Sequence, residues 1–354
     1  MTVQVEKVQR LLDEMNLQAL IIKSKANKTY LESLTGSGVW LLITKQTKYA
    51  FMDGRYVAEA QQKMSDFQIE IVFQGTYLQA IIEKLTALQI DNIGFEDLAF
   101  SIQEYQLLQA DEHHFEPLGS HLAVIRAIKT DAELVKMKAA CQLTDTAFAQ
   151  LLLHIKAGVS EKWLLGQLYA IIFDLGADGM AFEPIIASGT RGAMPHGRAT
   201  DKLIQEGELV TIDFGIILAG YQSDMTRTVA IGQPSVAMKR VYETVKAAQQ
   251  LGIDSLQVGT VAADNHNIVA DFITDRGYGD YFNHGLGHGM GIGDGELPVL
   301  NTKSRDQLQV GMVMSCEPGI YIPDLGGVRI EDDVVITKDG PVVLNETTKT
   351  LLVL

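Results

Sequence analysis

Five side chains in the C-terminal half of the chain could together hold metal ions. They lie in glycine-punctuated segments and are Asp213, Asp224, His288, Glu317 and Glu331. Four ionised carboxylates that converged on one point would repel one another, whereas two divalent cations would cancel their charge. Oxygen-rich ligation with one imidazole and no thiolate favours a fairly hard ion. The residue types therefore predict two divalent metal ions, with Mn²⁺ expected and Co²⁺ or Zn²⁺ as alternatives.

Two of these carboxylates lie on segments with the composition of hairpin strands. Residues 209–217 and 224–231 are the predicted strands, and Ala219-Gly220 lies in the turn between them. A turn centred between Leu218 and Ala219 would place Asp213 directly opposite Asp224. Directly opposed side chains have Cβ atoms about 4.5 to 5.5 Å apart, which suits two ions about 3.5 to 4 Å apart.

Each residue taken alone also has an ordinary structural explanation. Glu317 lies in a Glu-Pro-Gly turn sequence, and Glu331 begins a Glu-Asp-Asp run of the kind that is usually solvated. His288 is better placed, because the glycines on both sides of it allow close backbone approach to a site. Only the combination of all five residues favours a metal centre.

The elements that would position these residues begin after a separate α/β domain, residues 1–125. A first helix carries Val8, Leu11, Leu12 and Met15 at helical spacing. Strands are predicted at 18–23, 38–44, 48–53, 68–73 and 92–95, and helices near 55–64, 76–88 and 101–110.

Residues 126–354 form the second predicted domain. Thr130 and Glu133 make a capping box that opens a long helix. Ser160 opens a second helix, which Gly176 ends, and the motifs rich in strand residues follow. The domain boundary is therefore expected near residue 126.

Charge and composition restrict the partners. A net charge of −15 argues against nucleic acid and anionic membranes. The chain opens on an amphipathic helical pattern rather than a signal peptide and has no apolar run of membrane-spanning length, so we expect a soluble cytoplasmic protein. Cys141 and Cys316 are too few for a disulfide framework. Cys316 precedes Glu317, and we interpret it as a small buried residue rather than a nucleophile.

The motifs resemble those of the pita-bread metallopeptidases, the family of methionine aminopeptidase, aminopeptidase P and prolidase. The proline-specific branch is the most similar. The resemblance covers nearly the full length and is carried by residues 53–56, 126–134, 182–189, 195–197, 284–291, 317–321 and 328–332, together with the two Asp segments. It implies an N-terminal α/β domain that is creatinase N-terminal-like and ribonuclease H-like, followed by an α+β pita-bread catalytic domain.

The same resemblance assigns roles to individual residues. The metal ligands would be Asp213, Asp224, His288, Glu317 and Glu331, with Asp224 and Glu331 bridging the two ions and Glu317 also acting as general base. The catalytic or substrate-site side chains would be His196, His284, Arg329, Tyr321 and Phe182. The two histidines would line the substrate site without binding metal, although each alone could be an ordinary loop residue. Arg329 would orient a carboxylate ligand.

The resemblance implies a metal-dependent exopeptidase that hydrolyses Xaa-Pro bonds of short peptides with a metal-activated water. Dipeptidase and aminopeptidase activities remain open, and a homodimer is expected. Two other activities of the same fold fit less well. A creatinase-like amidinohydrolase lacks the metal ligands present here, and a methionine aminopeptidase usually lacks the large first domain.

One position departs from the family pattern. Gly295 stands where relatives carry a third histidine that contacts the scissile carbonyl. Losing one such donor typically costs about 10² to 10³ in turnover. The alternative function is therefore a catalytically weakened pita-bread protein that binds peptides or small molecules.

Overall fold

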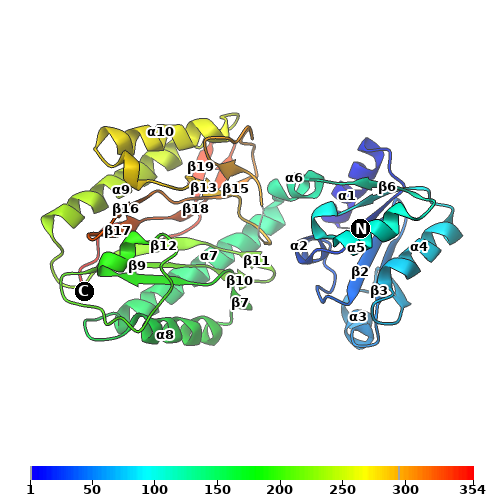
Figure 1. Ribbon diagram of the computed structural model, residues 1–354, viewed down its shortest axis with the longest axis horizontal. Helices are drawn as coiled ribbons and strands as arrows, with labels where there is room; N and C mark the ends of the chain where they lie inside the picture. The colour runs from blue at the N-terminus through cyan, green and yellow to red at the C-terminus, as the bar shows by residue number, and fades with distance from the viewer. Residues whose placement is uncertain (1, 294–295) are drawn as a thin grey trace. The chain divides into compact units, whose positions relative to one another are not determined.

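The computed structural model describes residues 2–293 and 296–354 and divides them into two compact units (Figure 1). The first unit ends at Arg126 and the second begins at Ala127.

The first unit is an α/β domain built on one six-stranded sheet, in the order β4-β3-β2-β1-β5-β6. Strand β1 runs antiparallel to β2 and parallel to β5, and their apolar faces pack against α4 in one core. The elements are α1 (Val3–Glu14), β1 (Ala19–Ile22), α2 (Lys25–Tyr30), β2 (Val39–Thr44), β3 (Lys48–Met52), α3 (Val57–Lys63), β4 (Gln68–Ile71), α4 (Tyr77–Leu88), β5 (Asn92–Phe95), α5 (Ile102–Gln109), β6 (His114–Pro117) and α6 (His121–Ala127).

The predicted elements of this unit coincide with α1, α3, α4, α5 and strands β1 to β5. The helices α2 and α6 and the strand β6 were not predicted. Helix α2 has only six residues, and β6 (His-Phe-Glu-Pro) has a single large apolar side chain and ends on a proline. Such short segments carry little periodicity, and β6 forms because it pairs in parallel with β5.

A buried carboxylate, Asp53, follows β3 and is surrounded by donors from its own unit. Arg55 donates from Nε to Oδ1 and from Nη2 to Oδ2, each at 2.8 Å, and the Tyr77 hydroxyl donates to Oδ2 at 2.5 Å. These hydrogen bonds hold the pKa of Asp53 below its ordinary value. The chain therefore supplies the countercharge for this group.

The second unit combines short sheets with four long helices. Its elements are α7 (Asp131–Leu151), α8 (Glu161–Asp174), β7 (Gly179–Met180), β8 (Ile185–Ser188), β9 (Leu209–Phe214), β10 (Ile216–Leu218), β11 (Tyr221–Gln222), β12 (Met225–Ala230), α9 (Val236–Ser255), α10 (Ala262–Asp275), β13 (Gly287–His288), β14 (Val299–Leu300), β15 (Val313–Cys316), β16 (Gly319–Ile322), β17 (Gly326–Arg329), β18 (Asp332–Thr337) and β19 (Gly340–Val343).

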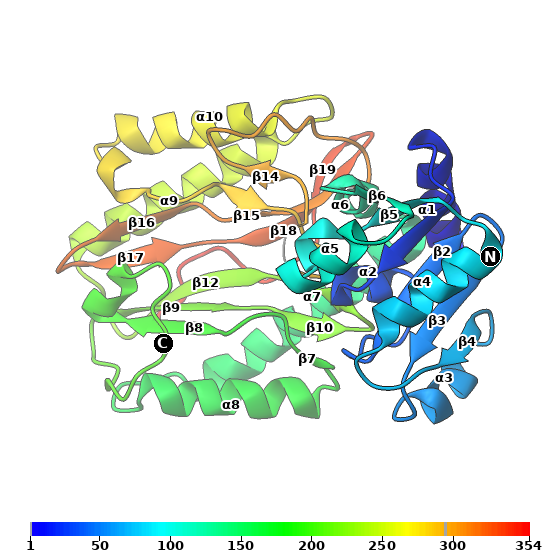
Figure 2. The same ribbon diagram turned by 45° about the vertical axis from the view of Figure 1, so that its right-hand side comes forward.

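Two large apolar clusters among the described residues of this unit lie on opposite sides of its strands. In one core, α7 and α8 pack against β8, β9 and β12, and in the other, α9 and α10 pack against β15, β17 and β18. Figure 2 shows the strands between these two pairs of helices. The strands that carry the predicted site residues therefore lie between two rigid layers.

The helix boundaries of this unit follow the local sequence signals. Thr130 caps α7 through the predicted capping box with Glu133. Ser160 caps α8 by accepting a hydrogen bond from the backbone N–H of Trp163. Gly176 follows α8 with a φ of +89°, a conformation that favours glycine. All three predictions are confirmed.

The predicted register of the hairpin was wrong by two residues. Strand β9 pairs with β12 so that Asp213 lies opposite Thr226, not Asp224. The cause is the turn: Ala219 and Gly220 both have positive φ, 50° and 81°, and form a two-residue turn between β10 and β11. The hairpin therefore turns between Ala219 and Gly220, and Asp224 lies diagonally from Asp213.

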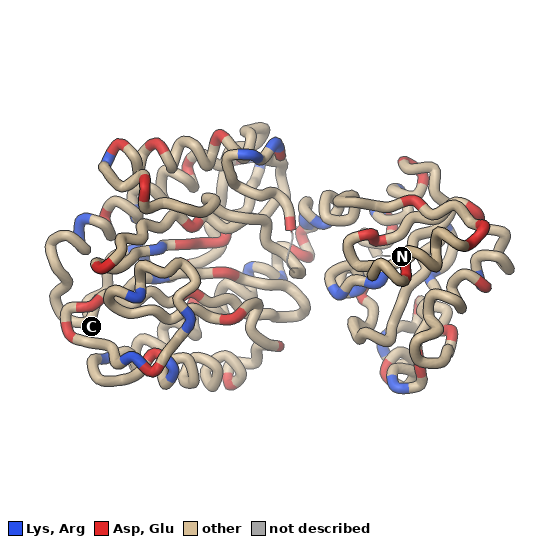
Figure 3. Tube along the Cα trace, viewed as in Figure 1, with Lys and Arg blue, Asp and Glu red and all other residues tan. Residues whose placement is uncertain are grey.

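No helix among the described residues is long and apolar enough to cross a membrane. Acidic and basic segments are interspersed along both units (Figure 3).

Both cysteines are buried free thiols. Burial raises the pKa of Cys316 well above its ordinary value, so this thiol stays protonated. The prediction that Cys316 is a small buried residue is confirmed.

Candidate metal centre

One cavity of about 720 Å³ in the second unit contains every predicted site residue. The five predicted ligands line it together with His196, His284, Arg329, Tyr321 and Phe182. These residues span positions 182 to 331 of the chain, so only the folded structure brings them to one place.

Each predicted ligand comes from a different strand or strand end. Asp213 lies on β9, Asp224 directly precedes β12, His288 ends β13, Glu317 directly follows β15, and Glu331 lies between β17 and β18. Glycine is required beside His288, because a Cβ at Gly287 would lie 2.0 Å from the Ser315 carbonyl oxygen. Tight packing of β13 against β15 thus brings His288 towards Glu317.

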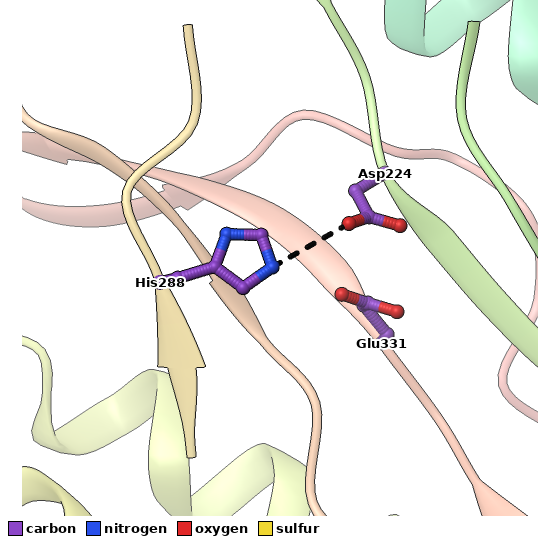
Figure 4. A group of neighbouring side chains, drawn as sticks. All are labelled: Asp224, His288 and Glu331. Atoms are coloured by element: carbon purple, nitrogen blue, oxygen red, sulfur yellow. Dashed lines mark ion pairs between the residues drawn. The ribbon is translucent and has the colours of Figure 1, made fainter. Parts of the chain in front are cut away.

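Three of the ligands form a close group. One ligand atom each from Asp224, His288 and Glu331 lies within 4.8 Å of the other two. Figure 4 shows these three side chains pointing toward one another. His288 Nε2 lies 3.7 Å from Asp224 Oδ2 and 3.5 Å from Glu317 Oε1.

Several carboxylate oxygens of the predicted ligands are placed so that they could coordinate cations. Asp213 Oδ1, Asp224 Oδ1 and Glu331 Oε1 are buried and have no hydrogen-bond partner within the described ranges of the chain. Two other oxygens of the ligands accept hydrogen bonds: Thr226 donates to Glu331 Oε2 at 2.6 Å, and Ser315 donates to Glu317 Oε1 at 3.1 Å. Burying an unpartnered carboxylate oxygen is costly, whereas such an oxygen suits a metal ion. The donor set therefore fits divalent ions.

The protonation behaviour of these groups agrees with this fit. Burial, and then the neighbouring carboxylates, raise the pKa of Asp224 and of Glu331 well above their ordinary values. Burial also raises the pKa of Glu317, although His288 and Arg329 oppose the shift. Without added positive charge, the folded protein resists full ionisation of this cluster.

Arg329 connects several residues of the site. Its Nε donates to Thr226 Oγ1 at 3.1 Å, and its Nη1 donates to the Tyr321 hydroxyl at 2.8 Å and to the Pro195 carbonyl at 3.2 Å. Its Nη2 donates to Asp213 Oδ2. This contact leaves Oδ1 of Asp213 as the oxygen available to an ion.

The two predicted catalytic histidines are in different environments. Burial lowers the pKa of His284 to about 4, so the ring is neutral at pH 7. Its Nδ1 lies 2.7 Å from the Gly285 carbonyl oxygen, which fixes the proton on Nδ1, and its Nε2 accepts from the Tyr321 hydroxyl at 2.9 Å. His196 is exposed and lines the cavity. Of the two, His196 is the ring free to contact a substrate.

In the described part of the chain, three side chains that hydrogen-bond to the predicted ligands were not themselves predicted: Thr226, Ser315 and Asp333. The first two lie two positions from Asp224 and Glu317 respectively, so the alternation of side chains along a strand could have indicated them. Asp333 Oδ2 accepts a hydrogen bond from the Asp224 backbone N–H at 2.8 Å.

The Glu331-Asp332-Asp333 run is buried throughout, unlike a solvated acidic run. Asp332 pairs with Arg227 at 2.6 Å, and burial raises the pKa of Asp333 to about 7. The predicted departure at Gly295 lies outside the described residues.

Comparison with known proteins identifies the family. Residues 135–338 match Metallopeptidase family M24, and residues 4–128 match the Creatinase/Prolidase N-terminal domain. The chain belongs to metallopeptidase family M24. The fold class predicted from the motifs is confirmed: a creatinase-like N-terminal α/β domain precedes the pita-bread catalytic domain.

Members of family M24 resemble this chain over its whole length. It is 37% identical to the uncharacterized peptidase YqhT of Bacillus subtilis, with 99% of each chain covered. The structure of an Xaa-Pro dipeptidase from Bacillus anthracis has a TM-score of 0.93 at 35% identity, with 99% of each chain covered. An X-Pro aminopeptidase from Thermotoga maritima has a TM-score of 0.93 at 30% identity, also with 99% coverage of each.

Proposed function

We propose that this family-M24 protein is a metal-dependent exopeptidase that hydrolyses Xaa-Pro bonds of short peptides. The observation that carries the proposal is a set of buried carboxylate oxygens grouped with His288 in one cavity, which have no hydrogen-bond partner among the described residues. Two similar proteins, the Bacillus anthracis Xaa-Pro dipeptidase and the Thermotoga maritima X-Pro aminopeptidase, support the proline specificity.

Five residues would hold two divalent ions, expected to be Mn²⁺: Asp213, Asp224, His288, Glu317 and Glu331. When bound, such ions polarise a carbonyl group and lower the pKa of water so that it can attack at neutral pH. Asp224 and Glu331, which form a close group with His288, are the proposed bridging ligands and would each serve both ions.

The remaining residues would position the substrate and move protons. Glu317 has a raised pKa and is the proposed general base. His196 is proposed to donate a hydrogen bond to the scissile carbonyl oxygen as negative charge develops on it. The Tyr321 hydroxyl links His284 to Arg329 and so helps to hold Asp213 in place. Phe182 offers the cavity an apolar surface for a proline ring.

We also infer the organisation of the chain: domains 1–125 and 126–354, assembled as a cytoplasmic homodimer. Light scattering at micromolar concentration is expected to give twice the chain mass of 38.8 kDa. A monomer would contradict the assembly and leave the catalytic proposal standing.

The direct test is turnover of Ala-Pro and Ala-Pro-Ala by purified protein with added Mn²⁺. Hydrolysis of Ala-Pro indicates dipeptidase activity, and release of alanine from Ala-Pro-Ala indicates aminopeptidase activity. Binding of both peptides without hydrolysis would instead favour the weakened binding protein.

The variant Gly295→His tests whether the missing histidine weakens catalysis. If the missing histidine limits turnover, the substitution is expected to raise kcat about tenfold, or about 1.4 kcal/mol of transition-state stabilisation, with unchanged metal content. Fast wild-type turnover that the substitution does not improve would show that the missing donor is not needed.

A further inference from the structure

A peptide with a free C-terminus must bring a carboxylate into a strongly acidic cavity. Among the described residues, six carboxylate side chains line it: Glu183, Asp213, Asp224, Glu296, Glu317 and Glu331. The five metal-centre residues would be balanced by bound ions, but those ions lie at the scissile bond in the proposed function. A carboxylate beyond that bond needs a cation of its own.

Two arginines line the cavity within the described part of the chain, Arg198 and Arg329. Arg329 is fully engaged: its Nε and both Nη atoms donate to Thr226, Tyr321, Pro195 and Asp213, and only 4% of its side chain is exposed. Moving it would release Asp213. Arg329 is therefore part of the metal centre's support and does not serve a mobile ligand.

Arg198, in contrast to Arg329, is exposed and makes an exposed ion pair. Its side chain is 72% exposed, and its Nη2 lies 2.8 Å from Oε2 of Glu183, which is itself 54% exposed. Exposed ion pairs of this kind contribute little stability, and either partner can exchange for another ion. A ligand carboxylate can thus replace that of Glu183, and Glu183 remains close enough to compete for the guanidinium.

The backbone that carries Arg198 is held firmly. Its N–H donates to the His196 carbonyl at 2.9 Å, and its carbonyl accepts from Arg191 Nη2. Arg191 Nε in turn donates to the buried Glu161 carboxylate, at 3.1 Å from Oε2. The residue also forms a β-bridge with Ile185, two positions after Glu183. Arg198 therefore starts from a fixed point two residues from His196.

We propose that Arg198 binds the free C-terminal carboxylate of an Xaa-Pro dipeptide and so determines specificity for dipeptide acids. The inference rests on the proposed function of the cavity. Guanidinium and carboxylate match as a bidentate pair, which a neutral amide cannot reproduce. In a tripeptide the carboxylate lies about 3.3 to 3.6 Å further along the chain, which weakens this contact.

The experiment compares Ala-Pro with Ala-Pro-amide, which differ only in the C-terminal charge. Arg198→Gln is expected to raise KM for Ala-Pro about 10- to 100-fold, with little change in kcat, the range for losing a hydrogen bond to a charged group. The KM for Ala-Pro-amide should not change. Glu183→Gln should lower KM for Ala-Pro, because it removes the competing carboxylate. Arg305→Gln, an exposed arginine outside the cavity, is the matched charge control.

Equal changes in KM for the acid and the amide in Arg198→Gln, or no change in either, would overturn the proposal. Calorimetric titration of the Mn²⁺-loaded protein with both ligands measures the same preference without turnover. A wild type that prefers the acid, with the preference lost in Arg198→Gln, supports the role of Arg198 even if no peptide is hydrolysed, an outcome that would contradict the proposed peptidase function alone.

Discussion

Asp53 in the first unit and the pair Asp224 and Glu331 in the second unit have opposite electrostatic surroundings. In the first unit, Asp53 receives hydrogen bonds from Arg55 and Tyr77, and its pKa is held below the ordinary value. In the second unit, Asp224 and Glu331 are buried beside other carboxylates, and their pKa values are raised. The residue types are the same, so the difference lies in what surrounds them.

The comparison teaches where each countercharge comes from. Two like charges 4 Å apart cost about 4 kcal/mol at an effective dielectric constant of 20. That cost is a large fraction of the roughly 5 to 15 kcal/mol by which a domain is stable. At Asp53 the countercharge is supplied by the chain itself, through Arg55. At Asp224 and Glu331 the described residues leave oxygens without partners, as expected where cations come from solution.

The largest predicted effect comes from breaking the metal centre. Asp224→Ala is expected to reduce metal content from up to two ions per chain to almost none, because the proposed bridging ligand serves both ions. Turnover should fall by at least about 10² to 10³, the loss seen when one key stabilising group is removed. Metal analysis and peptide hydrolysis measure the two effects, with Asp53→Asn as the control for metal content. Equal metal content in wild type and Asp224→Ala would refute the assignment.

A smaller effect separates the two kinds of carboxylate in metal-free protein. Asp53→Asn should lower Tm, on the order of 5 °C, because Arg55 loses its ionic partner. Glu331→Gln should leave Tm unchanged or raise it, because it removes a buried like charge and keeps an acceptor for Thr226. Thermal unfolding in chelator measures both variants. A clear loss of stability in Glu331→Gln would show that the cluster is stabilised by the chain itself.

The smallest effect is a difference in pH dependence. Asp53 has a lowered folded pKa, so its stabilisation is present above the ordinary value of 3.8 and is lost as pH falls through the folded value. Asp224 and Glu331 have raised folded pKa values. In metal-free protein they therefore lower the free energy of unfolding as pH rises above the ordinary carboxyl range.

Metal-free protein should therefore be more stable at about pH 5 than at about pH 8, since the raised carboxyls bind protons only when folded. Bound Mn²⁺ should reverse this order, because protons compete for the ligands. Calorimetric unfolding at both pH values, with chelator and with Mn²⁺, tests the reversal. The same trend in both conditions would count against cation binding by these carboxylates.

Local signals in the sequence were enough for much of the fold. The capping residues Thr130 and Ser160 and the stop at Gly176 mark helix ends through contacts within a few residues, so they could be predicted. Strands β1 to β5 were found because their segments carry apolar residues in runs or in alternation with polar ones. The short β6 was not, since its pairing with β5 depends on residues about 20 positions away.

The sequence by itself determined which chemistry was available: four carboxylates and an imidazole in glycine-rich segments, with no thiolate in a position to compete. The tertiary structure decided how those groups meet. The turn at Ala219-Gly220 set the hairpin register, and packing between the helix layers buried the Glu331 run. It also directed every guanidinium nitrogen of Arg329 into hydrogen bonds within the protein, whereas Arg198 remains exposed at the cavity. These outcomes depend on contacts between residues that are distant in the chain. Burial and neighbouring charge, rather than residue type, then set the pKa of each carboxyl group.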